Sequence, residues 1–296
     1  MNTALVYLLV TAAVFFGGAN FTLAGPVMTA LPPLWAAAAR FLFGTLLIMA
    51  IVAWRGGDLV GSARRHGPIY LMLGVVGIGG FNLLFFFALQ HTSPANAALI
   101  LATNPLLTTL LAALTLGERP TARQLAALPL ALIGVVVVIS GGSLERLAAL
   151  KISSGDALMI AADFAWAAYN VLTRRYMPAG PPLTNTSLVM AAGAALLVLV
   201  ALGSGEPLRM PGGEALAALA VMVIGGTVLF YLFWSIGIAH LGAGRTSLFL
   251  NLVPVFAMLL DTLVGILPTA AQLVGGALVI GGVTLAMLPR RQPAEA

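Results

Sequence analysis

Cysteine is absent from the 296 residues, and the chain has only three histidines and nine acidic residues. Without cysteine, the protein cannot form disulfides, thiolate-bound metal sites or a cysteine nucleophile. The motifs HExxH, GxSxG and the phosphate-binding P-loop are also missing. The sequence therefore gives little support to an enzyme, and it predicts neither a bound metal nor a cofactor.

Charge is scarce as well: Asp, Glu, Lys and Arg make up 8% of the chain, against roughly 25% in an ordinary soluble domain. Basic residues outnumber acidic ones by 14 to 9, but they are scattered through the loops rather than gathered in a stripe. We therefore expect the macromolecular partner to be a lipid bilayer and not nucleic acid.

Hydrophobic residues supply 60% of the sequence and form long runs. A transmembrane helix needs about 20 largely apolar residues to cross roughly 30 Å of hydrocarbon, so the predicted fold is an all-α membrane protein. Ser93 followed by Pro94 predicts a helix start, as an N-cap and first-turn pair. The ten expected spans are 4–24, 34–54, 69–89, 94–116, 122–140, 156–173, 185–204, 216–239, 243–266 and 269–288.

The basic residues indicate the direction of the spans. With the N-terminus in the cytoplasm, ten Lys and Arg residues fall in cytoplasmic segments, three fall on the opposite side, and Arg40 lies within a span. Because cytoplasmic loops carry the excess of positive charge, both termini are predicted to be cytoplasmic, in a bacterial-type inner membrane. The cytoplasmic residues are Arg55, Arg64, Arg65, Arg119, Arg123, Arg174, Arg175, Arg245, Arg290 and Arg291, and the others are Arg146, Lys151 and Arg209.

An internal repeat is visible as residues that recur in order at an offset of about 149. The pairs are Asn20 and Asn170, Pro32-Pro33 and Pro181-Pro182, Gly77 and Gly226, His91 and His240, Pro105 and Pro254, Pro120 and Pro268, Gln124 and Gln272, and Gly134 and Gly282. They predict two five-helix halves, residues 1–145 and 152–290, followed by a cytoplasmic tail, 291–296. Because five is an odd number of spans, the second half must be inverted relative to the first, which is a plan of secondary transporters.

These features resemble the EamA family of the drug/metabolite transporter superfamily over nearly the whole chain. The resemblance rests on the five-plus-five helices, the Arg in RFLFGTLL, the string LGERPTARQLAALPLALIGVVVVIS and the mid-helix prolines. Within that superfamily, the chain is most similar to the aromatic amino-acid exporters of the YddG type. The resemblance implies export of small metabolites through a central cavity. The second half departs from the pattern where Ile266 replaces the acidic Glu118.

Pro105 and Pro254 lie near the middle of the fourth and ninth spans. Each removes one backbone hydrogen bond, and a freed carbonyl in the membrane needs another partner from protein or a watery cavity. A passive kink is one interpretation. The symmetric placement of the two prolines favours the other, a pair of hinges.

Polar side chains within the spans should face the bundle interior, since a central charge costs about 2.5–3.5 kcal/mol. We predict that Arg40 forms a buried ion pair with a carboxylate at similar depth, Asp163 or Asp261, of which Asp261 is the easier partner. Asp163 is then either a protonatable residue of the cavity or a structural one. For the asparagines, helix-to-helix hydrogen bonding is the alternative to lining a cavity. The intramembrane polar residues are Asn20, Arg40, Asn82, Asn104, Asp163, Asn170, Asn251 and Asp261.

Aromatic residues concentrate in the third, sixth and eighth spans. An interfacial aromatic belt is one interpretation, but Trp166 lies too deep in its span for it. Aromatic walls with a few amides are typical of a site for a small amphipathic ligand, such as a neutral or aromatic amino acid. The predicted substrate site comprises Asn20, Asn82, Phe85, Asp163, Trp166, Tyr169, Asn170, Tyr231 and Trp234.

Together these patterns predict a secondary transporter, an exporter of neutral or aromatic amino acids that works by alternating access. Since no nucleotide-binding motif is present, the driving force would come from a gradient. A channel-like facilitator is the alternative, because inverted repeats also build pores. A membrane-embedded enzyme is a weaker one.

The charge distribution generates a direct test of topology. Reporter fusions after Gly142 and at Ala296 should report opposite sides of the membrane, with Ala296 in the cytoplasm. Alkaline phosphatase is active only outside the cytoplasm and green fluorescent protein only inside, so paired fusions read both sides. The same side for both positions would contradict the inverted repeat as well.

Overall fold

The computed structural model describes residues 1–151, 153–208 and 210–288, and over these ranges the regular structure is helical without a strand. The first-half elements are α1 (Thr3–Ala30), α2 (Pro33–Trp54), α3 (Leu59–Gly74), η1 (Val75–Gly80), α4 (Phe81–Leu89), α5 (Pro94–Leu101), α6 (Asn104–Leu116), α7 (Ala122–Ser140) and α8 (Leu144–Ala148). The second-half elements are α9 (Ser154–Tyr176), α10 (Pro182–Gly203), α11 (Gly213–Val223), η2 (Ile224–Leu229), α12 (Phe230–Leu241), α13 (Ala243–Leu248), η3 (Phe249–Leu252), α14 (Val253–Asp261), η4 (Thr262–Val264) and α15 (Ala270–Met287). The predicted tail, 291–296, lies outside the described residues, as do Arg209 and Arg290.

The observed helices follow the predicted spans closely, with α7 covering the same residues, 122–140. The largest difference is at α3, which begins at Leu59, ten residues before the expected start at 69. This stretch contains a kink, because His66 has non-helical dihedrals (φ −129°, ψ 16°) and Pro68 follows it. A prediction from hydropathy finds only the apolar part of this helix, because its first turns are polar.

Several helix starts are explained by local hydrogen bonds. Ser93 accepts a bond from the backbone N–H of Asn96, which confirms the expected start of α5. The repeated sequences PTARQL and PTAAQL form the same capping box. In it, the Thr hydroxyl accepts from the backbone N–H three residues on, and the Gln side chain accepts from the backbone N–H of the Thr.

Four of the long helical segments are interrupted in their middle. The segments α3–α4 and α11–α12 each contain a six-residue π-helix, η1 and η2. The α5–α6 segment breaks at Ala102 and Thr103 with Pro105 in the first turn of α6, and a 3₁₀ turn, η3, precedes Pro254 at the start of α14. The prolines therefore do deform their helices. Whether they act as hinges stays a prediction.

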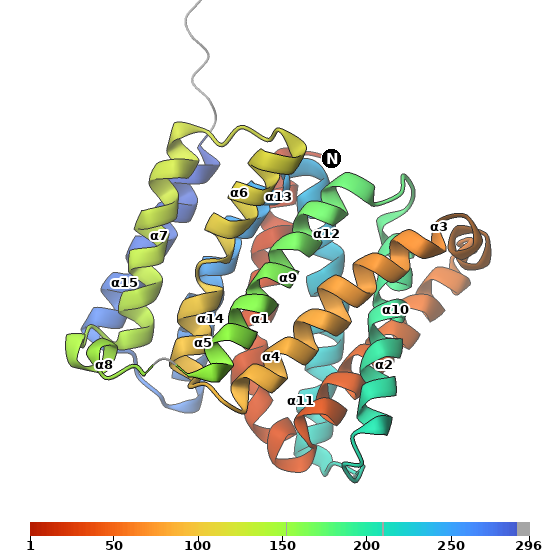
Figure 1. Cartoon of the computed structure of the whole chain (residues 1–296), viewed down its shortest axis with the longest axis horizontal. Coiled ribbons are helices and arrows are strands. Elements are labelled where there is room, and N and C mark those ends of the chain that lie inside the picture. Colours follow the sequence, from red (N-terminus) through yellow and green to blue (C-terminus); the bar gives the residue numbers. More distant parts are fainter. Residues whose placement is uncertain (152, 209, 289–296) are drawn as a thin grey trace, which may run out of the picture.

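The helices pack reciprocally between the two parts of the chain (Figure 1). The pairs α7–α15 and α2–α10 lie at opposite ends of the molecule, with α1, α4, α9 and α12 between them. Helix α1 packs against α12 and α14, and α9 packs in the same way against α4 and α6. The first helix of each half, α1 or α9, therefore packs against helices of the same order in the other half.

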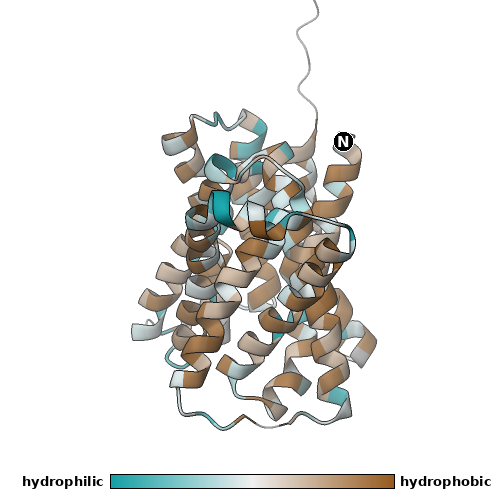
Figure 2. Ribbon diagram, turned by 90° about the vertical axis from the view of Figure 1, so that its right-hand side faces the viewer, coloured by the Kyte–Doolittle hydropathy of each residue, from teal (hydrophilic) through white to brown (hydrophobic). Residues whose placement is uncertain are grey.

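Nine helical segments of the described residues are long and apolar enough to cross a membrane. Helix α9 is not among them, although its 23 residues amount to about 35 Å at 1.5 Å per residue. It carries two aspartates and two arginines, so its status as a tenth span stays a prediction. Figure 2 shows hydrophobic residues along most of the helical length, with strongly hydrophilic segments toward the end that carries the N-terminus.

The crossing of α7 and α15 depends on glycine. A Cβ at Gly134 would lie 2.6 Å from the carbonyl oxygen of Gly275 and 2.7 Å from the backbone nitrogen of Val279. A Cβ at Gly275 would likewise lie 2.8 Å from the carbonyl oxygen of Gly134. Small residues let two membrane helices approach to backbone contact.

Gly134→Ala should therefore destabilise the protein by about 1–3 kcal/mol, the usual cost of overpacking. Backbone atoms oppose the new methyl group and cannot rotate away. Thermal unfolding of the purified protein in detergent measures the change. Gly281→Ala in α15 is the control, because no atom lies within 4 Å of that Cβ position. Equal stability of the two variants would contradict the close approach of α7 and α15.

Candidate functional site

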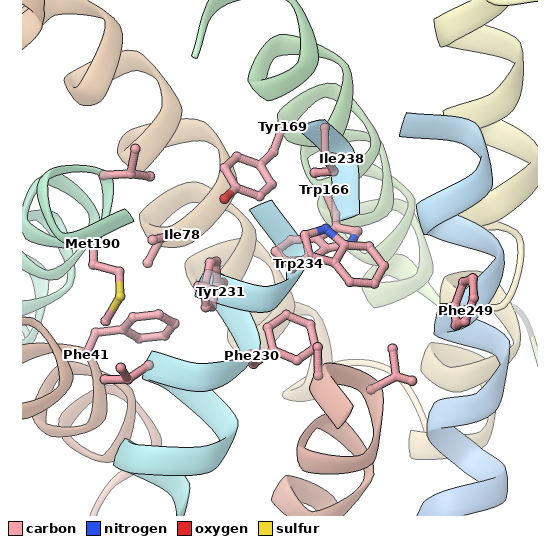
Figure 3. Close-up of a cluster of buried hydrophobic side chains, with 14 of the residues drawn as sticks. Phe41, Ile78, Trp166, Tyr169, Met190, Phe230, Tyr231, Trp234, Ile238 and Phe249 are labelled. Carbon is pink, nitrogen blue, oxygen red and sulfur yellow. The ribbon is translucent and has the colours of Figure 1, made fainter. Parts of the chain in front are cut away.

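Six aromatic rings meet in the middle of the molecule, and we call them the aromatic cluster: Phe81, Trp166, Tyr169, Phe230, Tyr231 and Trp234. All of them except Phe81 are labelled in Figure 3. Trp166 of α9 is at the centre, with ring centroids 5.1 Å from Phe81, 5.2 Å from Tyr169 and 5.8 Å from Tyr231. Phe81 and Phe230 are the first residues of α4 and α12, directly after the two π-helices. The helix interruptions thus position both rings.

The cluster is closed in this structure. Trp166 is 5% exposed and Trp234 is fully buried, so these rings do not form a belt at the membrane surface. Four of the side chains expected to line a central cavity instead pack ring against ring: Trp166, Tyr169, Tyr231 and Trp234. Phe85 lies at the edge, with its ring 5.9 Å from that of Phe81.

A chain of buried hydrogen bonds leads from the cluster to Asp163. Trp234 Nε1 donates to Asn170 Oδ1 (2.8 Å), and Asn170 Nδ2 donates to Thr108 Oγ1 (3.4 Å). The hydroxyl of Thr108 then donates to Asn104 Oδ1 (3.0 Å), and Asn104 Nδ2 donates to Asp163 Oδ1 (2.7 Å). Every donor in the chain points toward the carboxylate. Hydrogen bonds aligned in this way polarise and so strengthen one another in a low-dielectric interior.

Asp163 lies beside the break between α5 and α6. It is 2% exposed, and its Oδ2 is 3.1 Å from the hydroxyl of Thr103, which also lies 2.7 Å from the carbonyl oxygen of Ile100. A carboxylate on α9 therefore holds the first residues of α6.

The other predicted asparagines occupy helix crossings. Asn20 Nδ2 donates to the carbonyl oxygen of Gly226 in η2 (3.2 Å), where a Cβ would collide with the amide. In the same way, a Cβ at Gly77 in η1 would collide with the ring of Tyr169. Gly77 and Gly226 are 149 residues apart, and so are Tyr169 and Asn20, the side chains that face them. At this crossing the counterpart of Asn20 is therefore Tyr169, one residue before the expected Asn170.

The predicted ion pair between Arg40 and Asp261 is wrong. Arg40 Nη2 instead donates to Asn82 Oδ1 (3.4 Å), and its guanidinium carbon lies 4.8 Å from the ring centroid of Phe41. Asp261 accepts a hydrogen bond from the hydroxyl of Thr22 (2.8 Å). The prediction rested on the similar depth of the two residues in the membrane. However, α2, which carries Arg40, packs on α10 and α11, whereas α14, which carries Asp261, packs on α1.

One ion pair joins the two halves at the end that carries the N-terminus. Glu118, after α6, lies 3.5 Å from Arg174 Nε at the end of α9. The carboxylate also accepts from the backbone N–H groups of Ala243 (3.4 Å) and Gly244 (3.5 Å), where a helix N-terminus favours negative charge. Arg174 in turn donates to the carbonyl oxygen of Ala239. The contact therefore joins α6, α9, α12 and α13.

Two cavities of about 220 Å³ each lie away from the cluster. Both are smaller than the roughly 300–1,000 Å³ of typical small-molecule sites. The first lies beside both helix breaks and is lined by Pro105, Asn251 and six apolar residues. The second is at the ends of α3 and α10, next to the exposed pair Arg65 and Asp58. Within the described ranges no cluster of three His, Asp or Glu could hold a metal.

Sequence reasoning missed several residues of this centre. Thr103 and Thr108 were overlooked because threonine is common in membrane helices, although Thr108 is four residues from Asn104 and shares its face. Glu118 was noted only as a departure from the repeat, and its partner Arg174 was counted as a topology signal. The signal that could have found them is a pair of polar residues one helical turn apart beside a mid-helix proline, as Asn104 and Thr108 are beside Pro105.

Long apolar helices around a buried polar and aromatic centre are those of a membrane transporter. The chain belongs to the EamA-like transporter family, whose family model matches residues 4–140 and again residues 153–288. The resemblance inferred from the sequence is thereby confirmed.

Relatives and one solved structure cover nearly the whole chain. "Uncharacterized transporter YyaM" of Bacillus subtilis is 39% identical over 95% of this chain and 93% of its own length. "Aromatic amino acid exporter YddG" of Ancylobacter novellus is 28% identical over 89% and 90%, and "Probable amino-acid metabolite efflux pump" of Salmonella typhimurium is 28% identical over 90% and 89%. A crystal structure with 26% identity covers 97% of both chains and has a TM-score of 0.79.

Trp234→Phe tests the hydrogen-bond chain. The variant replaces the indole with a smaller phenyl ring that has no N–H. Asn170 Oδ1 is left buried without this donor, at an expected cost of about 1–3 kcal/mol, and the lost ring volume adds to that cost. Thermal unfolding in detergent reports the loss. Trp54→Phe is the matched control, because Trp54 is 85% exposed. A Trp234→Phe protein as stable as the control would show that this hydrogen bond contributes nothing.

Proposed function

We propose that this protein exports amino acids, with a preference for neutral or aromatic ones, across a bacterial inner membrane. The observation that supports this most directly is the aromatic cluster, which places rings and amide groups together in the middle of the bundle. Rings accept an apolar side chain, while the amides and the indole N–H groups suit the polar groups of a small amphipathic ligand. The names of two relatives, an aromatic amino acid exporter and an efflux pump, agree with this class.

We propose further that the two halves, residues 1–145 and 152–290, form an inverted repeat with ten spans and both termini in the cytoplasm. Support comes from the two separate matches of one family model. It also comes from the reciprocal packing of α1 and α9 and from the π-helices at corresponding positions. In such a plan, access alternates as one half rocks against the other around a fixed site.

In this mechanism, the pair of Glu118 and Arg174 closes the cytoplasmic end. The pair joins opposite halves, so opening that end separates the two charges. Both side chains are partly exposed, with relative exposures of 29% and 40%, and such a pair contributes about 0–1 kcal/mol. An interaction of this size can be broken and remade during each cycle.

Uptake into liposomes tests the function. Purified protein in liposomes loaded with unlabelled phenylalanine should accumulate labelled phenylalanine by exchange, and the rate should saturate and be competed by related amino acids. A flux that rises linearly with concentration would instead indicate a channel. Chemical conversion of the substrate would indicate an enzyme, and no uptake of any amino acid in a panel would contradict the proposal.

Trp166→Ala should weaken transport of aromatic amino acids. The loss of ring stacking should cost about 0.5–1.5 kcal/mol in apparent affinity beyond simple area loss. A small substrate such as threonine should suffer less. Apparent affinity is read from competition against labelled phenylalanine.

The matched control is Phe164→Ala, which removes an aromatic ring from the same helix at a position that is 51% exposed. It should leave the apparent affinity unchanged. If Trp166→Ala folds normally and carries every substrate with native affinity, Trp166 does not contact the substrate.

Asp163→Asn tests proton coupling. We propose that Asp163 exchanges a proton during the cycle, because it is buried in the centre and holds the deformed start of α6. Asn keeps the size of the side chain but cannot ionise. A pH gradient should drive accumulation by the wild type and not by the variant, which should still exchange substrate. An unchanged response to the gradient would remove Asp163 from the coupling mechanism.

A further inference from the structure

We propose that Arg40 binds the carboxylate group of the transported molecule, an inference that rests on the function proposed above. Arg40 lies in the second turn of α2, within a segment apolar enough to cross the membrane. A guanidinium in such a place should be paired, since an isolated charge within a span costs about 2.5–3.5 kcal/mol on insertion scales. Its protein partners are too few to satisfy it.

The guanidinium has five N–H donors, and the described part of the chain satisfies them poorly. One, on Nη2, donates to Asn82 Oδ1 at 3.4 Å, which is long for a hydrogen bond to a charged group. Nε is buried and has no acceptor. A buried donor without an acceptor is costly, so the site lacks an acceptor-rich group of negative charge.

The carboxylates within the membrane segments are engaged elsewhere. Asp163 accepts from Asn104, and Asp261 accepts from Thr22. The ion pairs of the described residues join Arg65 to Asp58 and Arg174 to Glu118, both at the ends of helices. No carboxylate of the described residues forms an ion pair with Arg40, and that includes Glu206, whose Oε2 is buried without a partner. A carboxylate supplied by a bound molecule matches the planar fork of the Arg40 donors.

The surroundings of Arg40 connect it to the aromatic cluster. Its guanidinium lies over the ring of Phe41, whose centroid is 5.5 Å from that of Tyr231. Tyr231 in turn is 5.8 Å from Trp166. Asn82, the hydrogen-bond partner of Arg40 among the described residues, is the second residue of α4 and directly follows Phe81 of the cluster. A ligand that spans this distance would carry a carboxylate at one end and an apolar or aromatic group at the other.

Three probes that share a phenyl ring separate the groups being recognised: L-phenylalanine, L-phenylalanine amide, and 3-phenylpropionate, which has the carboxylate without the amine. Calorimetry on the purified protein measures binding. The wild type should bind the two carboxylates and bind the amide more weakly. Arg40→Gln should weaken binding of both carboxylates by about 10- to 100-fold, the effect of losing one hydrogen bond to a charged group, and should leave the amide unchanged.

Arg64→Gln is the control, because Arg64 is exposed near the start of α3, and it should bind all three probes like the wild type. If Arg40→Gln does not fold, Arg40→Lys takes its place. It retains the charge without the bidentate fork, so it should also weaken only the carboxylates.

Two results would overturn the inference alone: native affinity of the Arg40 variant for phenylalanine, or an equal loss for phenylalanine and its amide. The second would mean that Arg40 is only structural. In both cases the wild type still binds phenylalanine and the transport function stands. If the wild type binds no amino acid at all, the proposed function fails, and the carboxylate site fails with it.

Discussion

Hydrocarbon offers no hydrogen-bond partners, so every polar side chain in the centre of this protein depends on another helix. Helix α9 carries two of these groups, Asp163 and Asn170, and it packs against α4, α6 and α12. The polar groups on the buried face of α9 are the ones that hold α6 and α12 against it, while Ile160 and Phe164 lie on its exposed face. The centre of the bundle is therefore both its structural core and its chemically distinctive region.

The two halves share their architecture but not their polar contacts. In the first half, the break before Pro105 is held by Asp163, whereas the corresponding 3₁₀ turn in the second half contains Asn251, whose Oδ1 is buried without a partner. The ion pair of Glu118 and Arg174 also lacks a repeat-related copy, because Ile266 and Gly25 occupy those positions. The opposite end of the bundle is joined by different contacts, since Asp156 at the start of α9 accepts hydrogen bonds from Thr92 and Asn96 of the first half.

Hydropathy and capping residues predicted the fold well, because span length and helix ends are local properties. The ends of α7, for example, follow from the capping box at Thr121 and Gln124 and from Gly141. The π-helices were not predicted, since glycines in α3–α4 show where a helix can deform but not how. Arg40 was assigned the wrong partner because sequence position gives depth in the membrane but not the rotation of the helix. The aromatic residues were correctly grouped, yet their closure into a packed cluster depends on side-chain geometry that spacing does not carry.

Distances between the halves test most directly whether access alternates around this centre. Because the native chain has no cysteine, spin labels attach only where cysteines are introduced. One pair is Arg119→Cys with His240→Cys, both exposed at the end closed by Glu118, and the repeat-related pair is His91→Cys with Leu267→Cys. Double electron–electron resonance, with and without phenylalanine, should show one distance lengthening while the other shortens. Unchanged distances, or changes in the same direction at both ends, would contradict alternating access.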